Sequence, residues 1–139
     1  MQRDYFIALE KLSNNSSLEL PKVVEQLAFN GQGLIPVIVQ DDKNKAILMF
    51  AWMNKESLLK TLETKRMTYW SRSRQKLWIK GETSGHVQKL IDMSFDCDGD
   101  TILCQVEQQG AACHTGRPSC FYLNVDVDNQ QVIVKGDHA

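Results

Sequence analysis

Short apolar blocks separated by polar turns run through most of the chain, and they predict more strands than helices. "GLIPVIVQD" and "AILMFAWM" flank "DKNK", which predicts a strand, a turn and a strand. In "TILCQVEQ" the apolar residues alternate, so Ile102, Cys104 and Val106 are expected to face one side of a strand. The other predicted strands are "MTYWS", "KLWIKGE", "CFYLNVDV" and "VIVK". Because proline cannot donate to a neighbouring strand, Pro36 should lie on an edge strand or where a strand starts.

Helices are predicted at three places. "RDYFIALEKL", from Arg3 to Leu12, is typical of a short amphipathic helix. Pro21 suits the first turn of a second helix that extends to Phe29. Asn54 is a preferred N-cap residue for a third helix, which ends near Lys65. One face of this helix is expected to carry Leu58, Leu59 and Leu62.

Together these elements predict an α+β fold, with a mainly antiparallel β sheet or open barrel and a few short helices. We expect residues 1–30 to form an N-terminal helical appendage and residues 31–139 to form the main domain. With 139 residues, the chain has the length of one domain and needs no covalent cross-links to fold.

Composition and charge narrow the range of functions. The chain is 42% hydrophobic and 24% charged with a formal net charge of -1, which is typical of a soluble globular protein. This balance gives no overall preference for nucleic acid or acidic membranes. No apolar run is long enough to span a bilayer, and the N-terminus has no pattern of a signal peptide. We therefore expect a reducing, cytoplasmic location, where cysteines are free, metal-bound or catalytic more often than paired.

The four cysteines all lie between residues 97 and 120. Cys104 occupies the centre of an alternating apolar strand and is interpreted as a buried core residue. Cys113 and Cys120 flank the short loop "HTGRPS", which can bring the two sulfurs together, and Cys97 comes from another segment. Three thiolates and an open fourth position would make a reactive zinc site. A closed structural site, completed by His114 or Cys104, remains the alternative.

Three aspartates surround the first of these cysteines in "DCDGD". In an extended segment Asp96, Asp98 and Asp100 would share one face and Cys97 would point to the other. Carboxylates favour Mg²⁺, so we expect a magnesium site beside the zinc ligand. An EF-hand is excluded because Thr101 stands where the calcium loop needs glycine. The alternative is an acidic turn in solvent.

Cations and aromatic residues alternate in "KRMTYWSRSRQKLWIKGETSGH". Such a stretch is typical of a single-stranded nucleic-acid surface, of a pocket for a phosphorylated metabolite, or of a solvated hairpin. The segment "GETSGH" favours the pocket, because its glycines allow backbone N–H groups to approach an anion. His86 at its end is a candidate proton carrier.

Four of these segments together resemble one enzyme family. "WMN", "YWSRSR..LW.KGETSGH.Q", "DCDGD" and "ACHTGRPSCFY" are similar, in this order, to motifs of phosphoribosyl-AMP cyclohydrolase, an enzyme of histidine biosynthesis. The resemblance covers residues 31–127. It implies that this main domain is a cyclohydrolase domain, which opens the adenine ring of 1-(5-phosphoribosyl)-AMP by hydrolysis of the N1–C6 bond. The product would be the formimino aminoimidazole carboxamide ribonucleotide.

The resemblance also implies the metal ligands and the assembly. Cys97, Cys113 and Cys120 match zinc ligands, and Asp96, Asp98 and Asp100 match magnesium ligands. The implied active form is an intertwined homodimer with one zinc ion per subunit, in which Cys97 of one subunit completes the site of the other. The expected partners are a small nucleotide substrate and a second copy of the chain, with no nucleic acid and no membrane.

Further roles are hypotheses. His86 or His114 would move the proton during water attack. Trp52 and Asn54 are candidates for the base or ribose pocket, and core packing is the alternative for Trp52. The candidate phosphate partners are Arg72, Arg74, Lys80 and Arg117.

Two alternative functions would use the same candidate residues. A zinc-stabilised RNA-binding module would use the basic aromatic stretch, with all four cysteines structural. A zinc-dependent nucleotide deaminase would release ammonia, although its H-x-E and P-C-x-x-C signatures do not occur in this sequence.

Overall fold

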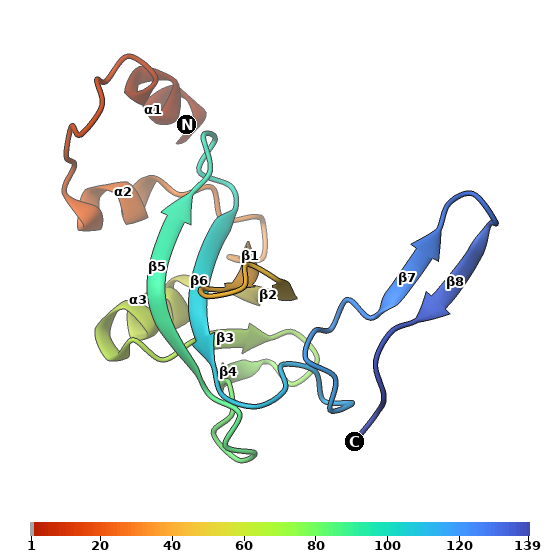
Figure 1. The fold of residues 1–139 in the computed structure, drawn as a ribbon. Helices are drawn as coiled ribbons and strands as arrows, with labels where there is room; N and C mark the ends of the chain where they lie inside the picture. Colours follow the sequence, from red (N-terminus) through yellow and green to blue (C-terminus); the bar gives the residue numbers. More distant parts are fainter. Residues whose placement is uncertain (1) are drawn as a thin grey trace.

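The computed structural model describes residues 2–139, with side chains from Asp4 onward. Its main sheet has the strand order β2–β1–β6–β5 (Figure 1). These strands are β1 (Ile35–Asp41), β2 (Ile47–Met53), β5 (Gln88–Phe95) and β6 (Ile102–Gln108). Two hairpins form separate two-stranded sheets, β3 (Thr68–Ser71) with β4 (Lys76–Ile79) and β7 (Leu123–Asp126) with β8 (Gln131–Val134). The helices are α1 (Gln2–Leu9), α2 (Leu20–Gln26) and α3 (Lys55–Thr64).

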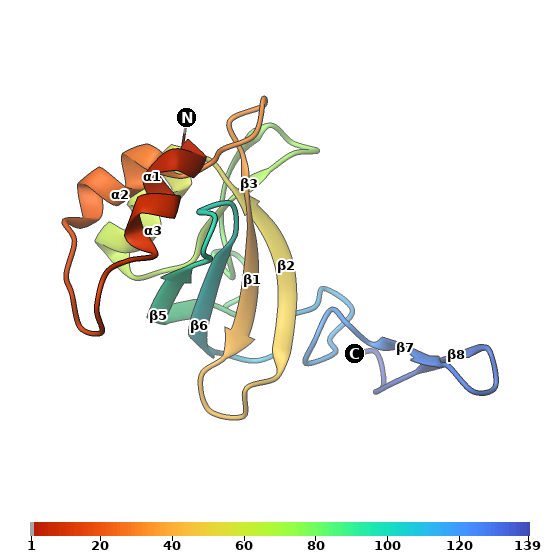
Figure 2. The ribbon, with the colours of Figure 1, turned by 90° about the horizontal axis from the view of Figure 1, so that it is seen from above.

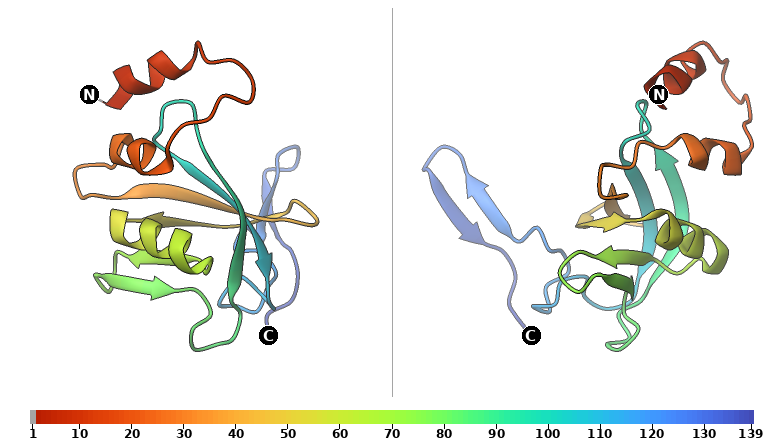
Figure 3. Two further views of the ribbon diagram at one scale, coloured as in Figure 1. Left: turned by 90° about the vertical axis from the view of Figure 1, so that its left-hand side faces the viewer. Right: turned by 180° about the vertical axis from the view of Figure 1, so that it is seen from behind.

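The predicted class is confirmed: the fold is α+β and its sheet is mainly antiparallel. Neighbouring strands pair antiparallel except β1 and β6, which run parallel. Among the described residues the strands do not close into a barrel. The three helices lie on one side of the molecule and the β7–β8 hairpin projects from the other (Figures 2 and 3).

Alternating apolar residues build the core. Val37 and Val39 on β1, together with Ile102, Cys104 and Val106 on β6, are fully buried. Because β1 and β6 are neighbours in register, these side chains form one continuous layer. The predicted inward face of "TILCQVEQ" is therefore confirmed, as is the core position of Cys104.

Pro36 lies at the start of its strand and not on an edge strand. β1 is an interior strand between β2 and β6, but its pairing with β6 begins only at Val37. The missing amide hydrogen of proline therefore interrupts no pair with β6.

Helix α3 begins and ends as predicted. The Asn54 side chain accepts from the Ser57 amide at 2.8 Å, and the Ser57 hydroxyl accepts from the Asn54 amide at 2.9 Å. Leu58 is fully buried and Leu62 packs against the core. Leu59 is 47% exposed, so its expected place on the same face is wrong. Residues four apart share a helix face, and the neighbouring residue is rotated away.

Strand β5 has no counterpart among the predicted elements. Its register against β6 shifts between Leu90 and Asp92, which marks a bulge. A bulge adds one residue to the strand and reverses the alternation beyond it, so the two-residue period is lost. The first two helices exist as expected but are shorter, ending at Leu9 and Gln26.

A buried polar chain links β3 to the main sheet. The Tyr69 hydroxyl donates to Oε1 of Gln88 at 2.5 Å, and Nε2 of Gln88 donates to Oε1 of Gln108 at 2.8 Å. Tyr69 and Gln88 are fully buried. Burial, followed by the nearby Cys104 and Cys120 thiols, raises the pKa of Tyr69 well above its usual value, so the hydroxyl keeps its proton.

Replacing Tyr69 with phenylalanine should therefore destabilise the fold. The substitution leaves a buried amide oxygen of Gln88 without its donor, which costs about 1–3 kcal/mol. Urea unfolding should show this loss relative to wild type, whereas Tyr5→Phe at a partly buried position should show little change. Equal stability of Tyr69→Phe and wild type would mean that this hydrogen bond contributes nothing.

No helix among the described residues is both long and apolar enough to cross a membrane.

Candidate active site

A cavity of about 640 Å³ opens between the β3–β4 hairpin, the loop after it and the loop after β6. Five predicted site residues line it: Arg74, Lys80, His86, Cys113 and His114. They come from three segments that are far apart in the sequence. The fold thus brings both candidate proton carriers, two candidate cations and one candidate zinc ligand to one place.

His86 is fixed by its surroundings in this cavity. Its Nδ1 lies 3.1 Å from the carbonyl oxygen of Ala111. Because a carbonyl only accepts, Nδ1 carries the proton in the neutral ring and Nε2 keeps its lone pair. A Cβ on Gly110 would lie 2.6 Å from Cδ2 of His86, so only glycine allows the ring to pack here. The His86 ring is therefore held with Nε2 as its hydrogen-bond acceptor nitrogen.

Cys113 and Cys120 lie next to each other, as their spacing predicted. Cys113 is buried, and its sulfur accepts a hydrogen bond from the Thr115 hydroxyl at 3.0 Å. Burial acts to raise the pKa of Cys113, but the bonds from Thr115 and Cys120 and the positive charge of Arg117 outweigh it and lower the pKa. Cys120 is exposed overall, yet burial around its thiol and the neighbouring Cys113 raise its pKa to about 11. The pair therefore places two sulfurs side by side, a set of donors that suits a thiophilic metal.

Lys80 brings a positive charge to these sulfurs. Its Nζ donates to the carbonyl oxygen of Ala112 at 2.6 Å and lies 5.3 Å from the ring centre of Trp78. Burial lowers the pKa of Lys80, against the raising effect of the Cys120 and Cys113 thiols. Its ammonium group can therefore balance thiolate charge as well as meet an anion in the cavity.

The acidic segment forms a turn, so the extended geometry expected for it is wrong. The Gly99 amide donates to the Asp96 carbonyl at 3.0 Å, and the Asp100 amide donates to the Asp96 carboxylate at 2.9 Å. The turn gathers possible ligand atoms of Asp96, Cys97 and Asp98 within 4.8 Å of one another. Cys97 therefore lies on the same side as two of the aspartates.

The third aspartate, Asp100, interacts directly with the first. A hydrogen bond with Asp96, then burial and the negative charges of Asp96 and Asp98, raise the pKa of Asp100. Partial burial acts to raise the pKa of Asp96, but backbone and side-chain hydrogen bonds from Asp100 lower it. This crowding of carboxyl groups fits a bound cation that neutralises them.

The acidic turn and the paired thiols are far apart within one chain. Residues 96–100 precede β6 and Cys113 follows it, so the two groups lie near opposite ends of this strand (Figure 1). A strand of seven residues spans roughly 23 Å. One chain therefore does not bring Cys97 to the other two sulfurs.

Comparison with known proteins identifies the family. The family model described as Phosphoribosyl-AMP cyclohydrolase matches residues 49–122, just over half of the chain. A phosphoribosyl-AMP cyclohydrolase of Alkalilimnicola ehrlichii is 52% identical over 128 residues, which are 92% of this chain and 90% of the relative. The chain belongs to the phosphoribosyl-AMP cyclohydrolase family. Its members are hydrolases.

Further relatives carry the same name. The phosphoribosyl-AMP cyclohydrolase of Hydrogenovibrio crunogenus is 51% identical over 129 residues, 93% of this chain and 87% of the relative. That of Ruegeria sp. is 61% identical over 101 residues, 73% of this chain and 78% of the relative. The segment matched by the cyclohydrolase family contains every site residue predicted from the sequence. The division of the chain at residue 30 stays a prediction.

The other predicted substrate contacts of this chain lie outside the His86 cavity. Asn54 and Arg72 line a second cavity, and Trp52 and Arg72 line a third beside the β3–β4 hairpin. The Arg72 guanidinium lies 5.0 Å from the Trp52 ring centre. Arg74 lines both this third cavity and the one with His86, so it connects the two.

Two of the predicted substrate contacts, Asn54 and Arg117, already have partners for their side chains within the chain. The Asn54 side chain is already used as the cap of α3. Arg117 lies over the Tyr122 ring at 4.1 Å, and its Nε donates to the Gly136 carbonyl at 3.2 Å. Their substrate contacts stay predictions.

Sequence reasoning missed Thr115. Its hydroxyl donates to the Cys113 sulfur and thereby orients it. A threonine two residues after a candidate ligand cysteine, in a loop with glycine and proline, is a signal that could have indicated this contact.

Proposed function

We propose that this chain is a phosphoribosyl-AMP cyclohydrolase of histidine biosynthesis. The supporting observation is the cavity in which His86 and His114 lie beside Cys113, in a chain of this family. Its mixed lining of histidines, cations and Trp78 suits a nucleotide with phosphate groups. The reaction is hydrolytic opening of the adenine ring of 1-(5-phosphoribosyl)-AMP.

Zinc is the metal proposed for Cys97, Cys113 and Cys120. The adjacent Cys113 and Cys120 sulfurs and the exposed Cys97 thiol supply three soft ligands and leave a fourth position open. A bound zinc ion would supply an acidified water molecule as the nucleophile. The hard carboxylates of Asp96, Asp98 and Asp100 would hold Mg²⁺.

The proposed enzyme is a homodimer with shared zinc sites. Two observations support this arrangement: Cys97 lies near the far end of β6 from the paired thiols, and the β7–β8 hairpin projects from the body (Figure 1). The hairpin exposes Leu123, Val125, Val132 and Val134, each by more than half. A lone hairpin is marginal in water, and an exposed apolar patch of this kind marks an interface.

In the proposed reaction, oxygen of water adds to C6 of the adenine ring and the N1–C6 bond then breaks. C6 keeps the new oxygen and becomes the carboxamide carbon, while N1 takes up a proton and stays in the formimino group. Nε2 of His86 accepts one proton from the water and returns it toward N1, and the second proton passes to the exocyclic imino nitrogen on C6, which becomes the carboxamide NH₂. His114, lining the same cavity, is the second candidate for this transfer.

Replacing His86 with alanine should slow turnover by about 10²–10⁴-fold while zinc content stays at the wild-type value. The imidazole is proposed to transfer a proton and is not a proposed zinc ligand. The turnover rate should therefore fall while the zinc content does not. His138→Ala, at an exposed position outside the cavity, is the matched control and should have wild-type turnover. Full activity of His86→Ala would remove His86 from catalysis and point to His114.

Product analysis tests the proposed reaction against its rivals. Incubation with 1-(5-phosphoribosyl)-AMP should give a product heavier by one water molecule, with no ammonia released. Ammonia release would identify a deaminase. An unchanged substrate, with tight and salt-dependent binding of single-stranded RNA, would support the RNA-binding module.

A further inference from the structure

The N-terminal segment packs directly on the acidic turn. Phe6 of α1 is 5% exposed, and its ring covers Gly99. Gly99 has φ +66°, and a Cβ placed there would lie 2.2 Å from Cε2 of Phe6. The close approach of the ring therefore needs glycine, both for space and for its backbone conformation.

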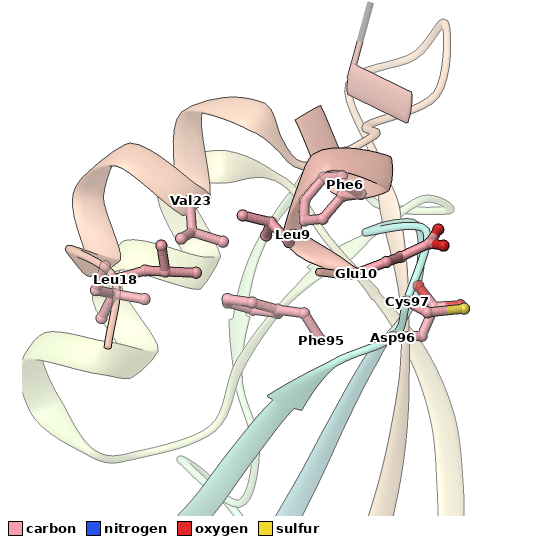
Figure 4. A pocket seen from close by; sticks show the side chains of 9 residues that line it. Phe6, Leu9, Glu10, Leu18, Val23, Phe95, Asp96 and Cys97 are labelled. Atoms are coloured by element: carbon pink, nitrogen blue, oxygen red, sulfur yellow. The ribbon is translucent and has the colours of Figure 1, made fainter. Parts of the chain in front are cut away.

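A second contact reaches the same glycine. The Ala28 amide, just after α2, donates to the Gly99 carbonyl at 2.8 Å. The turn is thus held from outside at Gly99 by Phe6 of α1 and by the segment that follows α2, in addition to its own hydrogen bonds to Asp96. Figure 4 shows Phe6 beside this turn, at an apolar pocket that Leu9, Val23 and Phe95 line together with Asp96 and Cys97.

The packing of Phe6 on Gly99 matters because the turn holds several negatively charged carboxylates close together. Ligand atoms of Asp96 and Asp98 lie within 4.8 Å of each other, where two ionised carboxylates repel. Repulsion favours conformations in which the ligand atoms separate. A ring packed on Gly99 opposes this separation and keeps the ligands together before the cation arrives.

We infer that Phe6 is a positioning residue for the metal ligands of the acidic turn, so that helix α1 belongs to the metal-binding apparatus. This inference rests on the proposed function, which assigns Asp96, Asp98 and Asp100 to Mg²⁺. A purely structural Phe6 would contribute to stability and leave the metal affinity of the folded protein unchanged.

The test is Mn²⁺ binding, with Mn²⁺ as a paramagnetic probe for the magnesium site. Full-length protein is titrated and free Mn²⁺ is counted by electron paramagnetic resonance, at a temperature where circular dichroism shows each variant folded. Phe6→Ala should weaken binding by about 10–100-fold, the usual effect of losing a residue that orients metal ligands. Phe6→Leu, which keeps apolar bulk over Gly99, should recover part of the affinity.

Val24→Ala is the matched control. Val24 is 2% exposed and lies in the same core cluster as Phe6. It belongs to α2, and none of its atoms is among the three nearest to a Cβ at Gly99. This variant should lose stability and keep wild-type Mn²⁺ affinity.

Wild-type affinity in folded Phe6→Ala would overturn the inference while the magnesium assignment stands. Should Phe6→Ala not fold, Phe6→Leu decides the question: weakened Mn²⁺ binding supports the inference and wild-type affinity overturns it. No Mn²⁺ binding by wild-type protein would instead remove the magnesium assignment, and the inference with it.

Discussion

Cys113→Ser is expected to lose both bound zinc and turnover. A serine hydroxyl has nearly the shape of the thiol but stays protonated at neutral pH and is a poor zinc ligand. Turnover should fall by at least about 10³-fold, a modest part of the roughly 10⁶-fold or greater acceleration that enzymes provide. Elemental analysis of the purified protein and the rate of ring opening measure the two effects.

The matched control for this variant is Cys104→Ala. Cys104 is fully buried, and burial, followed by the negative charge of Asp92, raises the pKa of its thiol to about 12, so it is a neutral core residue. This variant should lose some stability and keep zinc and turnover. A Cys113→Ser protein that retained both zinc and activity would disprove the zinc assignment.

Mixing two inactive variants should restore activity if zinc sites are shared between subunits. Cys97→Ser and Cys113→Ser each destroy both sites of a homodimer. In a mixed dimer, the intact Cys97 of one subunit meets the intact Cys113 and Cys120 of the other, so one complete site forms. Random exchange of subunits should give about a quarter of wild-type turnover, because half of the dimers carry one of two sites.

Each variant treated in the same way without the other is the control and should stay inactive. Zinc content should follow turnover, rising only in the mixture. No recovery after verified subunit exchange would mean that all three thiols act within one subunit, contrary to the position of Cys97 near the far end of β6.

Much of the fold follows from local pattern. The strand pairs β1–β2 and β3–β4, and the cap of α3 at Asn54, depend on residues close together in sequence. The parallel pairing of β1 with β6 was not predicted, because it joins segments more than sixty residues apart. β5 was missed since its bulge breaks the period that marks a strand.

The sequence predicted which residues belong to the candidate site better than it predicted how those residues are arranged in space. The loop between Cys113 and Cys120 is short, so spacing alone indicated that their sulfurs meet. The shape of the acidic segment depends on Gly99, whose positive φ bends the chain into a turn where the metal-site prediction assumed an extended segment. The contact between Phe6 and Gly99 depends on tertiary packing across more than ninety residues, which no local pattern reveals.

The most direct test of the whole account is turnover of 1-(5-phosphoribosyl)-AMP by protein purified with reductant, followed by ultraviolet absorbance with and without a zinc chelator. We expect ring opening that stops with the chelator and returns when zinc is added back. Absence of turnover from folded, zinc-loaded protein would contradict the proposed activity, and turnover unaffected by zinc removal would contradict the metal site.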